Sequence, residues 1–268
     1  MKDKPLVSVV VPTFNSERFL ERCLRSVRGQ TYLNVEVIVV DNYSRDKTRE
    51  IAKKYADRVV LCRAGRSKAR NVGANLARGE FIFSVDSDME LTCRVIEECV
   101  RKVLMDGFDA VIVPEISVGE GFWARCRALE KMCYIGDDLI EAARFFKRNA
   151  FEVVGGYDGE LVFGEDWDLS QRIRKAGYKI GRIKAVVRHH EGKLRLQEAI
   201  LKKRYYGKTL KQYRLKHPDE ARRQLTLIRP AFIKNWRKLI MDPLHTIGMF
   251  ILKACEYLAI VDYWLEER

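Results

Sequence analysis

Five short apolar runs alternate with helix-like stretches between residues 6 and 113, and this alternation constrains the fold more than any other feature. The runs are VSVVV, VEVIVV (35–40), RVVLC (58–62), FIFSV (81–85) and AVIV (110–113), with intervening segments that begin near Ser16, Asp46, Ser67 and Thr92. This β-α-β rhythm predicts a mainly parallel sheet with helices on both faces. The 268 residues, 47% of them hydrophobic, suffice for one large α/β domain with an appendage.

Three polar clusters follow directly after predicted strands. They are Pro12-Thr13-Phe14-Asn15, Asp41-Asn42-Tyr43-Ser44 and Asp86-Ser87-Asp88. Ligands of open parallel sheets bind outside the carboxyl ends of the strands. We therefore expect the three clusters to meet at one edge of the sheet and to form a binding site there.

The stretch FIFSVDSDME sets three acids at alternate positions after a buried strand, namely Asp86, Asp88 and Glu90. Carboxylates this close repel one another and raise each other's pKa unless a cation lies between them. The alternative is a solvated turn with the Asp residues usual in turns. The stretch therefore indicates a metal site or a turn, and the rest of the chain must decide between them.

Beyond about residue 115 the rhythm breaks. A helix is predicted over 123–134, and Glu165 and Asp166 stand at the start of another in GEDWDLSQRIRKAGYKI. Carboxylates at a helix start are favoured by the helix dipole, so simple capping is one explanation of this acidic pair. Catalysis is the other.

The net charge of +13 is concentrated in one segment. Residues 193 to 238 carry 15 Lys and Arg against 3 acids, whereas the remainder of the chain is nearly neutral. A basic helical tail on a neutral body fits an anionic membrane surface or an RNA-binding extension. The 7 Cys form no C-x-x-C pair, which favours a reduced, cytosol-like compartment over a disulfide framework.

A last apolar stretch runs from Pro243 to Leu265. It is interrupted by His245, Lys253, Glu256 and Asp262, which make it a poor free-standing transmembrane span. A helix packed on the core, an in-plane interfacial helix and one member of a helical bundle all remain open.

Six segments, in order, resemble glycosyltransferase family 2, whose members have the GT-A fold. They are VSVVVPTFNSERFLERCLRSVRGQTY, VEVIVVDNYSRDKT, GRSKARNVGANLARGEFIFSVDSD, FFKRNAFEVVGGYD, GEDWDLSQRIRKAGY and RHHEG, within residues 6 to 208. The chain lacks the Q-x-x-R-W motif of the family's processive synthases. The resemblance therefore implies transfer of a single sugar rather than polymer synthesis.

The resemblance assigns the acids after the fourth strand to a metal. Asp86-Ser87-Asp88 matches the family's D-x-D motif, which implies Mg²⁺ or Mn²⁺ carrying a nucleotide diphosphate. Asp88 is the strongest ligand candidate, and Asp86 is expected to bridge toward ribose or metal. Glu90 has the spacing to face the same side, with a solvated acid as its alternative. His189 corresponds to the family's late histidine near the metal or diphosphate.

The resemblance also implies contacts with the nucleotide. Asp41 matches the acid that hydrogen-bonds the nucleobase, without naming uracil or guanine. The nucleoside is further expected to touch Pro12, Thr13 and Asn15. Two cations at a helix start could reach phosphate, with a solvated basic face as the alternative: Lys68 and Arg70.

Asp166 matches the family's catalytic base. In a single displacement with inversion, a carboxylate within hydrogen-bond reach removes the proton of the attacking acceptor hydroxyl. Glu165 is expected to orient the acceptor.

Together these observations predict a metal-dependent, inverting hexosyltransferase that moves mannose or glucose from a GDP- or UDP-sugar to a lipid-linked acceptor, with no nucleic-acid partner and with a homodimer left open. The predicted segments are a GT-A domain over 1–192 (halves 1–114 and 115–192), basic amphipathic interface helices over 193–240 and a hydrophobic membrane-associated region over 241–268. The expected location is the cytoplasmic face of a membrane. Two rival classes are a sugar-nucleotide nucleotidyltransferase and an RNA-binding protein that uses the basic tail.

Overall fold

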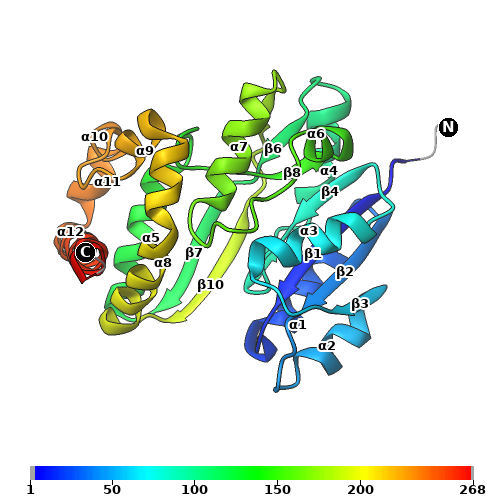
Figure 1. The fold of residues 1–268 in the computed structure, drawn as a ribbon, viewed down its shortest axis with the longest axis horizontal. Helices are drawn as coiled ribbons and strands as arrows, with labels where there is room; N and C mark the ends of the chain where they lie inside the picture. Colours follow the sequence, from blue (N-terminus) through cyan, green and yellow to red (C-terminus); the bar gives the residue numbers. More distant parts are fainter. Residues whose placement is uncertain (1–3, 267–268) are drawn as a thin grey trace. The chain divides into compact units, whose positions relative to one another are not determined.

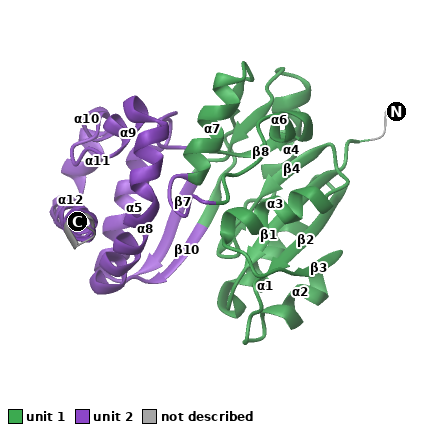
Figure 2. Cartoon of the chain, viewed as in Figure 1, with its two compact units in different colours: residues 1–114, 142–159, 165–188 green, residues 115–141, 160–164, 189–268 purple. Residues whose placement is uncertain are grey.

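The computed structural model describes residues 4–266, which divide into two compact units (Figures 1 and 2). The first unit comprises the chain up to Pro114 together with 142–159 and 165–188; the second comprises 115–141, 160–164 and the chain from His189 onward. Residues 1–3 and 267–268 belong to the first and last predicted segments and lie outside the described residues. The predicted boundaries at 192 and 240 stay a prediction.

The first unit contains strands and helices in alternation (Figure 1). Its elements are β1 (Val7–Thr13), α1 (Glu17–Arg28), β2 (Val35–Asp41), α2 (Thr48–Tyr55), β3 (Arg58–Leu61), α3 (Arg66–Leu76), β4 (Phe81–Ser84), β5 (Met89–Leu91), α4 (Val95–Leu104), β6 (Ala110–Ile112), β8 (Ala143–Lys147), α6 (Arg148–Val153), α7 (Glu165–Lys175) and β9 (Ile180–Arg182). The five predicted strands and the helices between them are all present.

Seven strands form the central sheet in the order β3-β2-β1-β4-β8-β6-β9. Strands β1 to β4 pair in parallel, as do β6 and β9, whereas β8 runs antiparallel to both β4 and β6. The prediction of a mainly parallel α/β sheet is confirmed. The antiparallel strand β8 comes from the part of the chain after about residue 115, where the alternation of strands and helices in the sequence ends.

Each face of the sheet is covered by its own helices. Along β1, Val7, Val9 and Val11 belong to the apolar cluster that includes residues of α1, α2 and α4, while Val10 belongs to the cluster with α3, α6 and α7. Successive strand residues point to opposite faces, so a continuous valine run serves both clusters. The runs in the sequence are therefore unbroken because the strands are buried on both faces.

Helix α3 lies unusually close to the sheet at Gly73. A Cβ at this position would come within 2.2 Å of Val10 Cγ1 on β1, which is well inside van der Waals contact. The glycine thus permits the close approach of α3, the helix that carries Arg66 and Arg70.

The second unit consists mainly of helices. Its elements are β7 (Glu115–Glu120), α5 (Phe122–Tyr134), β10 (Val187–Lys193, in this unit from His189), α8 (Leu196–Lys216), α9 (Pro218–Gln224), α10 (Pro230–Lys234), α11 (Trp236–Met241) and α12 (Pro243–Glu266). The helix predicted over 123–134 is confirmed as α5. A small apolar cluster joins Cys126 and Cys133 of α5, Phe232 of α10 and Met249 of α12.

We predict that Gly73→Ala lowers the free energy of unfolding by about 1–3 kcal/mol, because the added methyl overpacks the contact between α3 and β1. Chemical denaturation measures this change. The matched control is Asn75→Ala, on the exposed side of the same helix. Alanine is the better helix former at both positions, so the control should be neutral or slightly stabilising. Equal effects of the two substitutions would contradict the packing argument.

Candidate active site

The three polar clusters meet at the carboxyl edge of the sheet. Thr13 and Asp41 end β1 and β2 at paired positions, and Thr13 Oγ1 donates a hydrogen bond to Asp41 Oδ2 (3.1 Å). The loop after β4 joins them because Ser87 Oγ donates to Ser16 Oγ (2.9 Å). The convergence expected from the sequence is confirmed.

Asp41 is completely buried and is held by its own loop. Its Oδ1 accepts from the Ser44 backbone N–H (2.9 Å), and its Oδ2 accepts from Ser44 Oγ (2.5 Å). The backbone N–H of Asn15 also donates to Ser44 Oγ (2.8 Å), which ties the first loop to the second. Asn15 and Tyr43 adopt positive φ angles of 48° and 55°, a conformation that few residues other than glycine tolerate. These two loops therefore have a specified shape, which the predicted nucleoside contact would need.

A single buried guanidinium organises the carboxylates of this edge. Arg70, on α3, is fully buried and donates from Nη2 to Asp86 Oδ1 (2.6 Å) and from Nη1 to Asp166 Oδ1 (2.9 Å). The same Nη1 lies 3.3 Å from Glu165 Oε1. Its guanidinium also stacks over the ring of Tyr157 at 4.9 Å. Arg70 thus joins the loop after β4 to the start of α7.

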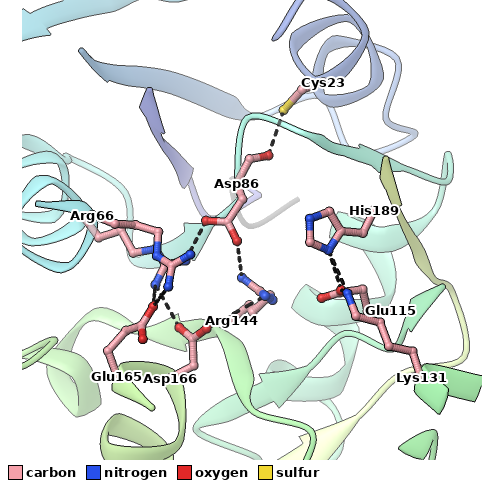
Figure 3. A network of polar contacts seen from close by, with 10 residues as sticks. Cys23, Arg66, Asp86, Glu115, Lys131, Arg144, Glu165, Asp166 and His189 are labelled. Carbon is pink, nitrogen blue, oxygen red and sulfur yellow. Dashed lines mark hydrogen bonds and ion pairs between the residues drawn. The ribbon is translucent and has the colours of Figure 1, made fainter. Parts of the chain in front are cut away.

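Two further arginines complete the network. Arg144, on β8, donates from Nη1 to Asp86 Oδ2 (3.2 Å), and its Nη2 lies 3.9 Å from Asp166 Oδ2. Arg66, one turn before Arg70 on α3, forms an ion pair with Glu165. The guanidiniums of Arg66, Arg70 and Arg144 therefore face the carboxylates of this edge. Figure 3 labels Arg66 and Arg144 beside Asp86, Glu165 and Asp166.

The network shifts the pKa values of its acids in opposite directions. Burial alone would raise the pKa of Asp86, but Arg70 and Arg144 outweigh it and hold that pKa far below the usual value. Burial, aided by the neighbouring charge of Asp166, raises the pKa of Glu165. Asp86 is therefore held as an anion, whereas Glu165 takes up a proton more readily than Asp86 does.

Asp88 lies in the loop between β4 and β5. Its Oδ1 is shielded from solvent, and its charge acts on the buried thiol of Cys23, whose pKa is raised first by burial and then by Asp88 and Asp86. Glu90, on β5, lies 3.7 Å from Arg188 Nη1. Glu90 thus has a cationic neighbour and is not simply a solvated acid.

The carboxylates of the candidate site suit a cation that binds together with a nucleotide substrate. Among residues 4–266, no group of three or more His, Cys, Asp or Glu side chains is arranged to hold a metal ion. Magnesium-type ions bound with nucleotides need only one or two carboxylates, because phosphate and water oxygens complete the octahedron. Asp88, with Asp86 beside it, supplies carboxylate oxygens of that kind. The residues therefore suit Mg²⁺ or Mn²⁺ together with a diphosphate rather than a permanently bound ion.

The remaining predicted site residues lie in different surroundings. Pro12 is buried in β1, whereas Lys68 is exposed on α3 and Arg70 is buried. The two cations predicted to reach phosphate are therefore not equivalent. His189 belongs to the second unit, where its Nδ1 lies 2.7 Å from Glu115 Oε1 and 3.0 Å from Lys131 Nζ (Figure 3). Its role at a metal stays a prediction.

Sequence reasoning missed Arg66, Arg144 and Tyr157. Arg66 could have been found, because it lies four residues before Arg70 and shares its helix face. Arg144 and Tyr157 carry no comparable signal, since they reach the site through the antiparallel β8 and the turn after α6.

An α/β sheet with acids at its carboxyl edge, one of them in an Asp-Ser-Asp sequence, defines a GT-A glycosyltransferase fold. The model of "Glycosyl transferase family 2" matches residues 8–157, more than half of the chain. The chain belongs to this family.

A curated relative agrees with this assignment, and two solved structures have a similar fold. Glycosyltransferase GlyG of Streptococcus pneumoniae is 36% identical over 114 residues, 40% of this chain and 38% of GlyG, so well under two thirds of that relative is spanned. The mannosyltransferase PcManGT from Pyrobaculum calidifontis, solved with GDP-Man and Mn²⁺, has a TM-score of 0.66 at 18% identity over 97% of this chain and 88% of its own. Residues 1–349 of S. aureus TarS, solved with UDP-GlcNAc, have a TM-score of 0.59 at 19% identity over 92% and 81%. The two structures share the fold with this chain.

We predict that Arg70→Met lowers the free energy of unfolding by about 3–5 kcal/mol at neutral pH, because it leaves buried carboxylates without their main counter-charge. The clustered acids then acquire raised pKa values in the folded state. A carboxylate whose folded pKa is raised takes up protons on folding, so the variant gains stability as pH falls. Its deficit relative to the wild type should shrink between about pH 7 and pH 5.

Denaturant titrations at the two pH values test this prediction. The control is Arg94→Met, which removes an exposed arginine paired with the exposed Glu97 and should cost no more than about 1 kcal/mol. A deficit for Arg70→Met that is small, or constant with pH, would show that the guanidinium does not compensate these carboxylates.

Proposed function

We propose that this protein is a metal-dependent, inverting hexosyltransferase. It transfers one mannose or glucose from a GDP- or UDP-sugar to a membrane lipid-linked acceptor, such as a saccharide on a polyprenyl phosphate or diphosphate. The observation that carries the proposal is the shared contact of Asp86 and Asp166 with Arg70. One guanidinium thereby supports both the acid of the Asp-Ser-Asp sequence and the candidate base.

The donor half of the reaction is assigned to the loops after β1, β2 and β4. Asp41, Thr13 and Asn15 would receive the nucleoside, with Pro12 setting the course of the chain. Asp88 would hold a Mg²⁺ or Mn²⁺ ion, with Asp86, Glu90 and His189 as further candidates. When bound, such an ion neutralises the charge that develops on the diphosphate as the anomeric bond breaks.

The acceptor half is assigned to the start of α7. The acceptor oxygen forms a bond to the anomeric carbon from the face opposite the diphosphate, whose oxygen leaves with the bonding electron pair. Asp166 takes the proton of the attacking hydroxyl. Arg70 anchors Asp166 Oδ1, which fixes the direction of this carboxylate. The neighbouring Glu165 would orient the acceptor.

The hexose and nucleotide are inferred from chemistry shared with structural neighbours. PcManGT was solved with GDP-Man and Mn²⁺, and TarS with UDP-GlcNAc. Both ligands are nucleoside diphosphate sugars, the class whose leaving group needs a cation. We extend only this class to the present chain, with a GDP- or UDP-hexose as the donor.

A lipid-linked acceptor is supported by the composition of the second unit. Its helices carry the concentrated basic charge, and within the described residues one segment, Pro243–Tyr263, is long and apolar enough to cross a membrane. Basic residues near an anionic leaflet contribute about 1 kcal/mol each to membrane attraction. We therefore assign the enzyme to the cytoplasmic face of a membrane.

We predict that Asp166→Asn lowers transfer by about 10²–10⁴-fold, because the amide cannot accept the acceptor's proton. Donor affinity should change little. Product formation and nucleoside diphosphate calorimetry separate the two effects. The control is Asp109→Asn, whose carboxylate pairs with Lys147 just before β6, at the opposite edge of the sheet. Transfer by Asp166→Asn at the wild-type rate would show that another group is the base.

A second prediction concerns the cation. Asp88→Ala should abolish the part of donor affinity that depends on Mn²⁺, and excess metal should not restore it because the ligand itself is gone. Calorimetry with a nucleoside diphosphate, with and without Mn²⁺, measures this. The control is Ser87→Ala, which removes the hydrogen bond to Ser16 and keeps both carboxylates. Unchanged metal dependence in Asp88→Ala would place the cation elsewhere.

A further inference from the structure

The buried face of helix α12 carries two charges beside its buried apolar residues Met249 and Leu252. Lys253 and Glu256 are only 7% and 5% exposed. Lys253 Nζ donates to Glu130 Oε1 (2.8 Å) and lies 3.3 Å from the Tyr134 hydroxyl, both on α5. Of the charges that interrupt the apolar sequence, Lys253 and Glu256 are thus directed toward the protein, whereas Asp262 is exposed and pairs with Arg204 of α8.

Glu256, like Lys253, has oppositely charged partners on neighbouring helices. It forms an ion pair with Arg127 of α5, and its Oε2 lies 3.7 Å from Lys203 Nζ of α8. Arg127 also donates from Nη1 to Glu130 Oε2 (3.0 Å), so the pairs form one connected network. Burial lowers the pKa of Lys253 to about 8 against the opposing effect of Glu130.

This network opposes a transmembrane orientation of α12. Withdrawing the helix from α5 would separate Lys253 and Glu256 from their partners and place both in hydrocarbon, while leaving Glu130 and Arg127 uncompensated. The helix passes the test of length and composition for a span, yet within Pro243–Tyr263 the charged Lys253 and Glu256 are buried against α5 and α8, and the exposed Asp262 pairs with Arg204 of α8. The helix is therefore attached to α5 and α8 as a unit.

The outward face of α12 is apolar. Leu244, Ile247, Ile251 and Leu258 are between 47% and 64% exposed. They are spaced by three, four and seven residues, so they form one stripe along the helix. Soluble helices place polar residues on such a face, which means that water is a poor environment for this one.

The apolar surface continues onto the two preceding helices. The exposed residues there are Ile233 on α10 and Trp236, Ile240 and Met241 on α11. Helices α10 and α11 contact each other and α5, and α11 also contacts α12. Figure 1 shows α10, α11 and α12 following one another along one side of α5. We call these eight exposed residues of α10 to α12 the apolar surface.

The charges of neighbouring residues indicate which partner the apolar surface contacts. Between Leu225 and Met241 the chain carries Arg229, Lys234, Arg237 and Lys238 and no acid. The Arg237 guanidinium lies 5.7 Å from the Trp236 ring, as at a boundary between water and an apolar phase. A second copy of this chain would bring the same positive charge against itself. An anionic bilayer offers both the apolar interior and the opposite charge.

We propose that the apolar surface inserts into one leaflet of an anionic membrane, so that α12 lies in the plane of the bilayer and does not cross it. The inference deepens the proposed function, since it names where an enzyme with a lipid-linked acceptor meets the lipid. The test of this inference needs neither sugar donor nor acceptor. The inference can therefore fail while the proposed reaction holds, and the proposed reaction can fail while the inference holds.

The first experiment is flotation of the full chain with vesicles of phosphatidylcholine, alone or with one quarter phosphatidylglycerol. Binding should require the anionic lipid. The variant Ile247→Glu with Ile251→Glu should bind about 100-fold more weakly or worse, because two apolar side chains no longer leave water. Its thermal unfolding should match the wild type, since both positions are exposed. The control is Met105→Glu, an equally exposed apolar residue of the first unit, which should bind normally.

Three outcomes of this experiment would overturn the proposal. The first is equal binding to both vesicle types, or binding to neither. The second is full vesicle binding by the double Glu variant. The third is a change from dimer to monomer in the double Glu variant while its vesicle binding is unchanged. The last result would assign the surface to a second copy of the chain.

A second experiment separates the in-plane helix from a spanning one. Lys253→Met removes a charge that a spanning helix would carry into hydrocarbon, so spanning predicts tighter vesicle binding. The in-plane arrangement predicts unchanged vesicle binding and a lower unfolding temperature, because Glu130 loses one of its cationic partners. A protease cleavage site added after Arg268 should stay accessible on vesicles with protein added from outside. Protection of that site, or tighter binding by Lys253→Met, would contradict the proposal.

Discussion

The candidate active site of the first unit depends on the ion pairs of the buried Arg70 guanidinium. A charge removed from water must be compensated by partners with fixed geometry. Arg70 finds Asp86, Asp166 and Glu165, and these acids in turn require Arg144 and Arg66. Gly73 allows α3, the helix that carries Arg70, to lie close to β1. The Arg70 side chain therefore contributes to packing, to the compensation of buried charge and to the proposed chemistry.

This arrangement also explains why two adjacent acids of α7 can have different tasks. Asp166 is oriented through one oxygen by Arg70, while Glu165 is almost completely buried and has a raised pKa. Simple helix capping accounts for neither observation, because both side chains are engaged by arginines from α3. The alternative of capping alone thus explains less than the catalytic interpretation does.

Much of this could be predicted from sequence, for a physical reason. Apolar runs buried on both faces identify β1, β2, β4 and β6, and the ends of parallel strands place Thr13, Asp41 and Asp86 at one edge. The burial of Arg70 could not be predicted, because a helix position says nothing of what packs above it. Arg144 depended on β8, an antiparallel strand inserted after the periodic part of the chain. In the second unit, the sequence left three roles open for α12. Only the partners of Lys253 and Glu256 show that these two charges are directed inward.

The most direct test of the central claim is release of nucleoside diphosphate from a panel of sugar nucleotides, including GDP-mannose, GDP-glucose, UDP-glucose and UDP-N-acetylglucosamine. The assay contains membranes as a source of acceptor and either Mn²⁺, Mg²⁺ or a chelator. The account predicts release from a hexose donor that stops with chelator, returns when the metal is restored, and accompanies transfer of the sugar to the lipid fraction. Absence of release from every donor with either metal, or release that persists in chelator, would contradict it.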